Sequence, residues 1–130
     1  MFNFFKKRKA QKERMELLKE ALIQSLETST KNDQLFDKYI NDDDYGLISS
    51  KPIYTCQSSG SIAFLNKLKT INGECLTWKR TLAISVQDID GIVDEYSCFL
   101  ETGEKYGTIY LNMYSSQKPS KAPKGYIYLE

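Results

Sequence analysis

Histidine is absent from this chain of 130 residues, and its absence excludes several classes of function at once. Without an imidazole, the chain cannot form a Ser-His-Asp or Cys-His catalytic site, an HExxH zinc site or any metal site with histidine ligands. Catalysis would have to rest on carboxylates, tyrosines, lysines or a single thiol. We expect no metal and no cofactor, and a non-enzymatic role is favoured over an enzymatic one.

Cysteine is scarce, and its spacing predicts no disulfide framework. Cys56, Cys75 and Cys98 are odd in number and form no CxxC pair. No apolar run approaches the roughly 20 residues that a membrane-spanning helix needs. Aromatic residues at 2–5 precede the basic run at 6–9, which is the reverse of the order in a secretory signal. The expected localisation is therefore the reducing cytoplasm.

Charge is nearly balanced in total but unevenly distributed along the chain. The formal net charge is +1, from 18 basic and 17 acidic residues. Basic side chains gather at Lys6, Lys7, Arg8 and Lys9, directly after three phenylalanines. This combination is typical of segments that bind anionic membrane surfaces or other polyanions. Residues 2–14 are therefore a candidate attachment segment for a membrane or a nucleic acid, although a solvated chain end explains the same pattern.

The length and the composition fit a single domain. We predict a basic and aromatic extension at residues 1–8, followed by one α+β domain at residues 9–130. The domain is expected to be helical over residues 9–40 and β-rich over residues 45–130.

An apolar stripe marks the helical part. Met15, Leu18, Leu22 and Leu26 recur at steps of three and four residues. Polar residues at 29–32 are expected to end this helix before a second, shorter one, which gives a helical hairpin or elbow. Because an apolar helix face normally packs on a neighbouring layer, we expect the stripe to cover the sheet, so that Leu22→Asp would unfold the domain.

The β-rich part indicates a mostly antiparallel sheet of four to six strands. Three segments of alternating polarity lie within residues 76–114, and turn sequences at 88–91 and 101–104 separate them. Arg80 falls on the apolar side of the first segment, which predicts either a β-bulge near residues 80–82 or a position for Arg80 at the rim of the sheet. Residues 126–129 are expected to form an edge strand.

Five aromatic residues are the candidate binding residues. Tyr106, Tyr110 and Tyr114 share one face of the third segment by the two-residue period of a strand. With Trp78 on a nearby strand they suit an aromatic platform for a peptide or a base, and Tyr126 lies on the expected edge. The alternative is a second buried face beneath the N-terminal helix. The sequence leaves both interpretations open.

The carboxylates form no recognisable site. Asp42, Asp43 and Asp44 are adjacent, so they do not converge on one ion. Asp94 and Glu95 are neighbours in a predicted strand, so they point to opposite faces and do not make a catalytic pair. We assign no catalytic and no metal-binding residue.

A resemblance to known proteins covers most of the β-rich part. It is carried by Tyr45-Gly46-Leu47, Lys51-Pro52-Ile53-Tyr54, Asn72-Gly73-Glu74, Leu76-Thr77-Trp78-Lys79-Arg80, Asp94-Glu95-Tyr96, Ile109-Tyr110-Leu111-Asn112-Met113-Tyr114 and Ala122-Pro123-Lys124-Gly125. From about Tyr45 to Gly125 the chain resembles a family of small, uncharacterised bacterial proteins. The resemblance implies a compact bacterial domain, and it brings no known activity and no site residues.

The function that these observations favour is a non-enzymatic, cytoplasmic protein-binding module of regulatory, inhibitor or immunity type. It would use the tyrosine-bearing sheet face or the edge at residues 126–129. One alternative is a small-ligand or nucleotide-handling enzyme with a pocket of carboxylates and tyrosines. Another is attachment to a membrane surface or nucleic acid through residues 2–14. A homodimer is a further alternative, and the sequence does not identify the protein partner.

Overall fold

The computed structural model describes the backbone of residues 2–129 and the side chains of residues 7–129. The side chains of Phe2, Phe4, Phe5 and Lys6, which belong to the candidate attachment segment, lie outside the described residues. The elements are α1 (Phe2–Tyr39), β1 (Ile53–Tyr54), α2 (Gln57–Asn66), β2 (Leu68–Thr70), β3 (Thr77–Ile84), β4 (Val93–Phe99), β5 (Lys105–Asn112) and β6 (Tyr126–Tyr128). The predicted α+β class is confirmed.

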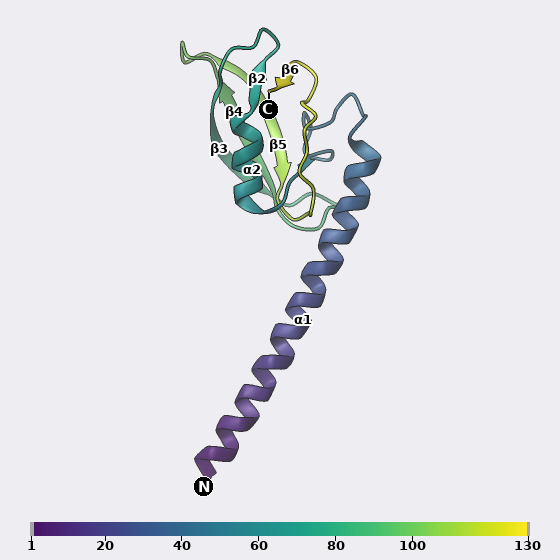
Figure 1. Ribbon diagram of the computed structural model, residues 1–130, viewed down its shortest axis with the longest axis vertical. Coiled ribbons are helices and arrows are strands. Elements are labelled where there is room, and N and C mark those ends of the chain that lie inside the picture. Colours follow the sequence, from purple (N-terminus) through teal and green to yellow (C-terminus); the bar gives the residue numbers. More distant parts are fainter. Residues whose placement is uncertain (1, 130) are drawn as a thin grey trace.

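The first part of α1 projects away from the rest of the molecule (Figure 1). We call residues 2–27 the arm and residues 28–129 the body. The arm begins to meet the body at Thr28, the first residue of α1 with a partly buried side chain among those described.

A four-stranded sheet forms the centre of the body. Its strand order is β1-β5-β4-β3, with β1 parallel to β5 and the other two pairs antiparallel. Strands β2 and β6 form a second, antiparallel sheet. The register of β3 against β4 shifts between Arg80 and Leu82, which confirms the predicted bulge. Gly103, with φ of +89°, turns the chain between β4 and β5, a conformation that favours glycine.

The hydrophobic core lies between the main sheet and α2. Ile109 and Leu111 of the central strand β5 are fully buried, and Phe64 and Leu65 of α2 join them in one cluster. Tyr126 of β6 belongs to the same cluster. The layer that covers the sheet therefore comes from segments inside the β-rich part of the sequence, and α1 is not needed for it.

The expected break in the N-terminal helix is wrong, because α1 runs without interruption to Tyr39. Thr30 donates its hydroxyl to the carbonyl oxygen of Leu26 at 2.9 Å, within the helix. Asn32 is fully buried and directs its side chain into the body. The Thr30 hydroxyl shares the carbonyl four residues earlier, which a helix tolerates, and the Asn32 side chain is used in tertiary contacts, so neither ends the helix.

The expected packing of the apolar stripe is also wrong. Leu18, Leu22 and Leu26 are exposed by 70%, 62% and 60%. These residues precede the part of α1 that touches the body, and α2 already covers the sheet. Nothing in the described chain packs over the stripe, so Leu22→Asp is not expected to unfold the body.

Candidate functional site

The most unusual surface of the molecule is the apolar side of the arm. We call Met15, Leu18, Leu22, Ile23 and Leu26 the arm stripe; all are more than half exposed. At about 100° per residue they gather on one side of the helix. Contiguous apolar surface of this kind on a soluble protein usually marks an interaction site.

The base of the arm is fixed to the body by Asn32. Its side-chain amide donates to the carbonyl oxygens of Tyr114 at 2.9 Å and Asp90 at 3.2 Å, and it lies 3.4 Å from Oδ1 of Asn112. Asn112 donates to the same Asp90 carbonyl at 3.0 Å. A buried amide with several partners holds one orientation. Asn32 thus joins α1 to the end of β5 and to the loop before β4.

Charged contacts flank this amide on either side. The Lys31 Nζ atom lies 3.3 Å from Oδ1 of Asp90. Asp33 accepts hydrogen bonds from the backbone nitrogen and the hydroxyl of Ser116. One helix turn further on, Phe36 is buried in the body. These contacts set the direction in which the arm leaves the body.

A notch of about 600 Å³ lies where the arm leaves the body. Its lining combines Leu26 of the arm stripe with Ile92, Met113 and Tyr114 of the body. Ile92 and Tyr114 are 37% and 38% exposed. The apolar surface of the arm therefore continues onto the body.

Tyr114 owes its position to two local features. β5 ends at Asn112, whose side-chain oxygen accepts a hydrogen bond from the Tyr114 backbone nitrogen at 2.9 Å. Gly91, with φ of +84°, lies against the Tyr114 ring so closely that a Cβ atom would stand 2.4 Å from it. Only glycine leaves room for the ring at this point.

The other predicted tyrosines lie elsewhere on the body. The Tyr106 hydroxyl donates to the Gly125 carbonyl oxygen, and its ring packs edge-on against Tyr126 at 5.1 Å between centroids. Tyr110 is half-buried and donates to Oε2 of Glu95 at 3.0 Å. Tyr106, Tyr110 and Tyr114, which the sequence placed on one face of a strand, therefore contact different neighbours in the body.

The remaining two candidate residues belong largely to the interior. Trp78 is half-buried and packs edge-on against Tyr96, with 5.7 Å between ring centroids. Tyr126 is buried, and burial raises the pKa of its hydroxyl. Gly107 makes room for this hydroxyl, since a Cβ atom there would meet the Tyr126 oxygen at 2.2 Å.

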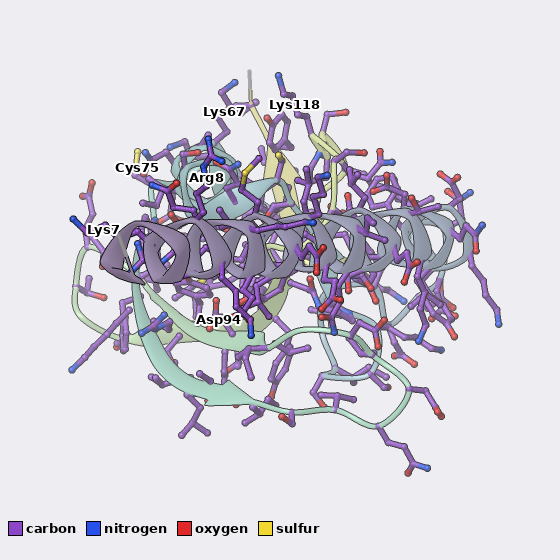
Figure 2. The ribbon with its side chains drawn as sticks, turned by 90° about the horizontal axis from the view of Figure 1, so that it is seen from below. Lys7, Arg8, Lys67, Cys75, Asp94 and Lys118 are labelled. Carbon is purple, nitrogen blue, oxygen red and sulfur yellow. The ribbon has the colours of Figure 1, made fainter. Side chains whose placement is uncertain are left out.

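A second cavity lies beside α2, at the far side of the body from Asp94. Lys67 and Lys118 line it together with Phe64 and Tyr128. Figure 2 shows both lysines on one side of α1 and Asp94 on the other, with Lys7 and Arg8 near the tip of the arm. The Phe64 and Tyr128 rings stack at 5.5 Å, so this cavity has an aromatic wall.

A groove between the arm and the loop before β4 contains two carboxylates, those of Glu27 and Asp90. Lys31 lines the same groove and pairs with Asp90. Over the described part of the chain, no group of three or more Cys, Asp or Glu side chains is placed to hold a metal ion. Within the same residues, no helix combines the length and the apolarity needed to traverse a bilayer.

Comparisons with protein-family models, with curated proteins and with solved structures return no match for this chain. The resemblance to small bacterial proteins therefore stays a prediction.

Sequence reasoning missed Asn32, Ile92 and the exposure of the arm stripe. Asn32 and Phe36 are four residues apart and so share one side of a helix. Phe36 also lies five full turns after Leu18, so the side of the helix that carries the stripe is the side that meets the body further along α1. Ile92 follows a glycine in a turn, and no periodic pattern distinguishes it.

Proposed function

We propose that this protein is a protein-binding module whose contact surface is the arm stripe together with the notch. The observation that carries this proposal is the exposure of five large apolar side chains on a helix that the body does not cover. Burial of such side chains in a partner contributes about 25 cal/mol per Å² of apolar area. The arm stripe thus offers the driving force that a stable complex needs.

The charge of the stripe segment supports a protein partner over a membrane surface. Between Met15 and Leu26 there is one lysine against two glutamates. Helices that lie on anionic membranes carry many basic residues beside their apolar face. The densest group of basic residues in the chain lies before the stripe, within residues 6–14.

The notch gives the surface a fixed shape. Because Asn32 and its partners hold the base of the arm, Leu26, Ile92 and Tyr114 keep their relative positions. Preorganised apolar groups around an aromatic anchor are typical of interface hot spots. Tyr114, one of the five aromatic candidates from the sequence, is the tyrosine that we include in this surface.

Photo-crosslinking in the living host tests the proposal. A benzophenone amino acid replaces Leu22 in one variant and Leu17 in a matched control. Leu17 is equally exposed, at 64%, but lies on the other side of the helix. We expect a discrete protein adduct from position 22 that a second change, Leu18→Asp, removes.

The control at position 17 should give no such adduct. Equal labelling from positions 17 and 22, or labelling of lipid alone, would refute the proposed protein-binding surface.

A further inference from the structure

We propose that the cavity beside α2 binds a nucleoside monophosphate, at a site separate from the arm stripe. We call it the lysine cavity. It has a volume of about 430 Å³ and lies between α2, residues 117–119 and Tyr128 of β6. Its lining joins two lysines that have no carboxylate partner to an aromatic wall. This inference goes beyond the proposed function and does not rest on it.

One side of α2 forms the floor of the lysine cavity. Gly60, Ala63, Phe64 and Lys67 all line it, and their spacing places them on one side of the helix. Gly60 and Ala63 have the smallest side chains, so a flat group can approach the helix closely between them. The lining extends from Gln57 to Lys67, which is about 15 Å at 1.5 Å per residue. The cavity therefore has the length and the volume of a small-molecule site.

Aromatic rings lie beside a cation in this cavity. Phe64 is buried, and its ring stacks on that of Tyr128 with 5.5 Å between the centroids. The Nζ atom of Lys67 lies 5.9 Å from the centroid of the Tyr128 ring. Tyr128 is only half-buried, so part of its ring stays accessible. Apolar aromatic surface next to a positive charge suits a ligand that has a planar ring and a negatively charged group.

The two lysines of the cavity have no acidic partner. The ion pairs of the described residues use Lys31, Lys51 and Arg80 as their cations. Within this part of the chain, no carboxylate pairs with Lys67 or Lys118, and no acidic residue lines the cavity. Both ammonium groups are therefore available to a bound anion.

The two segments that form the cavity are basic as a whole. Residues 56–73 and 113–129 contain no aspartate and no glutamate, and they contain the lysines Lys67, Lys69, Lys118, Lys121 and Lys124. Figure 2 shows Lys67 and Lys118 on one side of α1, with Asp94 on the other. A region with charge of one sign raises the local concentration of ions of the opposite sign.

A phosphate monoester fits this charge better than a carboxylate does. It carries a charge of about −1.5 to −2 at pH 7, and lysine is a common phosphate ligand. Two ammonium groups at one cavity match such a charge. The aromatic wall offers contact to a planar base, as aromatic side chains do in many nucleic-acid sites. A nucleoside monophosphate combines the phosphate and the base in one small ligand.

Isothermal titration calorimetry of the purified chain tests the proposal. The probes are adenosine monophosphate and uridine monophosphate, and the partial ligands are adenosine, uridine and inorganic phosphate. We expect a monophosphate to bind about tenfold or more tightly than its nucleoside or inorganic phosphate, because it contacts both the lysines and the wall. Inorganic phosphate that binds as tightly as both monophosphates would overturn the nucleoside. No binding of either monophosphate at about 5 mM would overturn the site.

Two pairs of variants locate the site. Lys118→Gln removes a cation from the cavity and should weaken binding by about five- to tenfold, because a hydrogen bond to a charged group is lost. Lys124→Gln, at an exposed position outside the cavity, should change it by less than about twofold. Ala63→Glu puts a carboxylate into the cavity and should abolish binding. Its control is Ile62→Glu, at the neighbouring exposed position, which does not line the cavity.

All four variants change exposed side chains, so we expect them to fold, and a thermal melt of each checks this. Equal losses of binding in both members of each pair would indicate attraction by general surface charge and would overturn the cavity as the site.

The failure of this inference is distinguishable from the failure of the proposed function. Leu22→Asp lies on the arm and should leave the binding of the monophosphate unchanged. Loss of this binding in Leu22→Asp would overturn the separation of the two sites. Binding of the monophosphate without a protein adduct from position 22 would refute the arm surface and keep the lysine cavity.

Discussion

Asp94 is a charged residue in an unfavourable place. Its carboxylate is buried in β4, and the nearby guanidinium of Arg80 lies 3.8 Å away with its own side chain mostly exposed. Burial raises the pKa of Asp94 above its usual value of 3.8, and Arg80 offsets this only in part. At pH values between 3.8 and the raised pKa, the Asp94 carboxyl group is protonated in the folded chain and ionised in the unfolded chain. The free energy of unfolding therefore falls as the pH rises through this window.

Asp94→Asn should therefore stabilise the body at pH 7. We expect the melting temperature to rise by a few degrees, because the neutral amide removes the cost of burying a charge. The gain should disappear near pH 3, where the aspartate is protonated in both states. Thermal melts from pH 3 to pH 8 measure this. Glu95→Gln, on the neighbouring residue that accepts bonds from Tyr110 and Thr81, should give no gain.

Tyr110 should behave as a partly buried residue. Tyr110→Ala is expected to lower the free energy of unfolding by about 1–2 kcal/mol, less than the loss of a fully buried aromatic ring. Tyr110→Phe, which loses only the hydrogen bond to Glu95, should cost about 1 kcal/mol or less. Urea denaturation distinguishes the two variants. An unchanged midpoint for Tyr110→Ala would mean that the ring contributes nothing to the fold and is available for recognition.

At the scale of elements, a buried amide contributes to the joint between α1 and the body, beside the contacts of Lys31, Asp33 and Phe36. Asn32→Ala removes the donor to the carbonyl oxygens of Asp90 and Tyr114 in a buried site. We expect a loss of about 1–3 kcal/mol in the free energy of unfolding, since the Tyr114 carbonyl oxygen loses its donor in a part-buried site, whereas Asn112 still donates to the Asp90 carbonyl oxygen. Thr30→Ala, whose hydroxyl bonds only within the helix, should cost less than about 0.5 kcal/mol. Equal losses for both would contradict the role of Asn32.

Leu22→Asp should leave the body intact. The side chain is exposed and precedes the part of α1 that meets the body. Surface changes of this type usually alter stability by less than about 0.5 kcal/mol. Near-UV circular dichroism and the melting temperature of the body, taken at concentrations where the chain is monomeric, are the measurements. Loss of the near-UV spectrum would show that the stripe packs on the body after all.

Sequence patterns predicted those elements whose structure depends on neighbouring residues. The bulge at Arg80 followed from a charge on an apolar side of a strand, and the turn at Gly103 followed from turn chemistry. The period of the arm stripe identified which side of the helix is apolar, but not what covers it. The sheet is covered instead by α2, whose Phe64 and Leu65 join the core cluster.

The candidate site was harder to predict for the same reason. Tyr114 departs from the strand period because Asn112 turns the backbone with its side chain. Asn32 resembles a helix cap in sequence and becomes a tertiary anchor only through residues 58 and 82 positions away. Contacts over such separations leave no local pattern.

For the whole molecule, hydrogen exchange should divide the chain near Thr28. The described side chains of the arm, at residues 7–27, are exposed to solvent, and isolated helices are marginally stable in water. We expect the arm amides to exchange rapidly in the isolated chain, while the amides of β4 and β5 stay protected. Leu22→Asp should leave this division unchanged. Arm amides protected as strongly as those of β4 would contradict it.

The anchoring of α1 to the body at Asn32 also has a mechanical consequence. The helix is 38 residues long, and about 25 of them separate the anchor at Asn32 from Lys7. While the helix is formed, an arm of about 38 Å that turns by about 10° at its base moves its tip by about 7 Å. A small rearrangement of the Asp90 loop would thus be amplified into a large displacement at the far end, which makes this joint a lever.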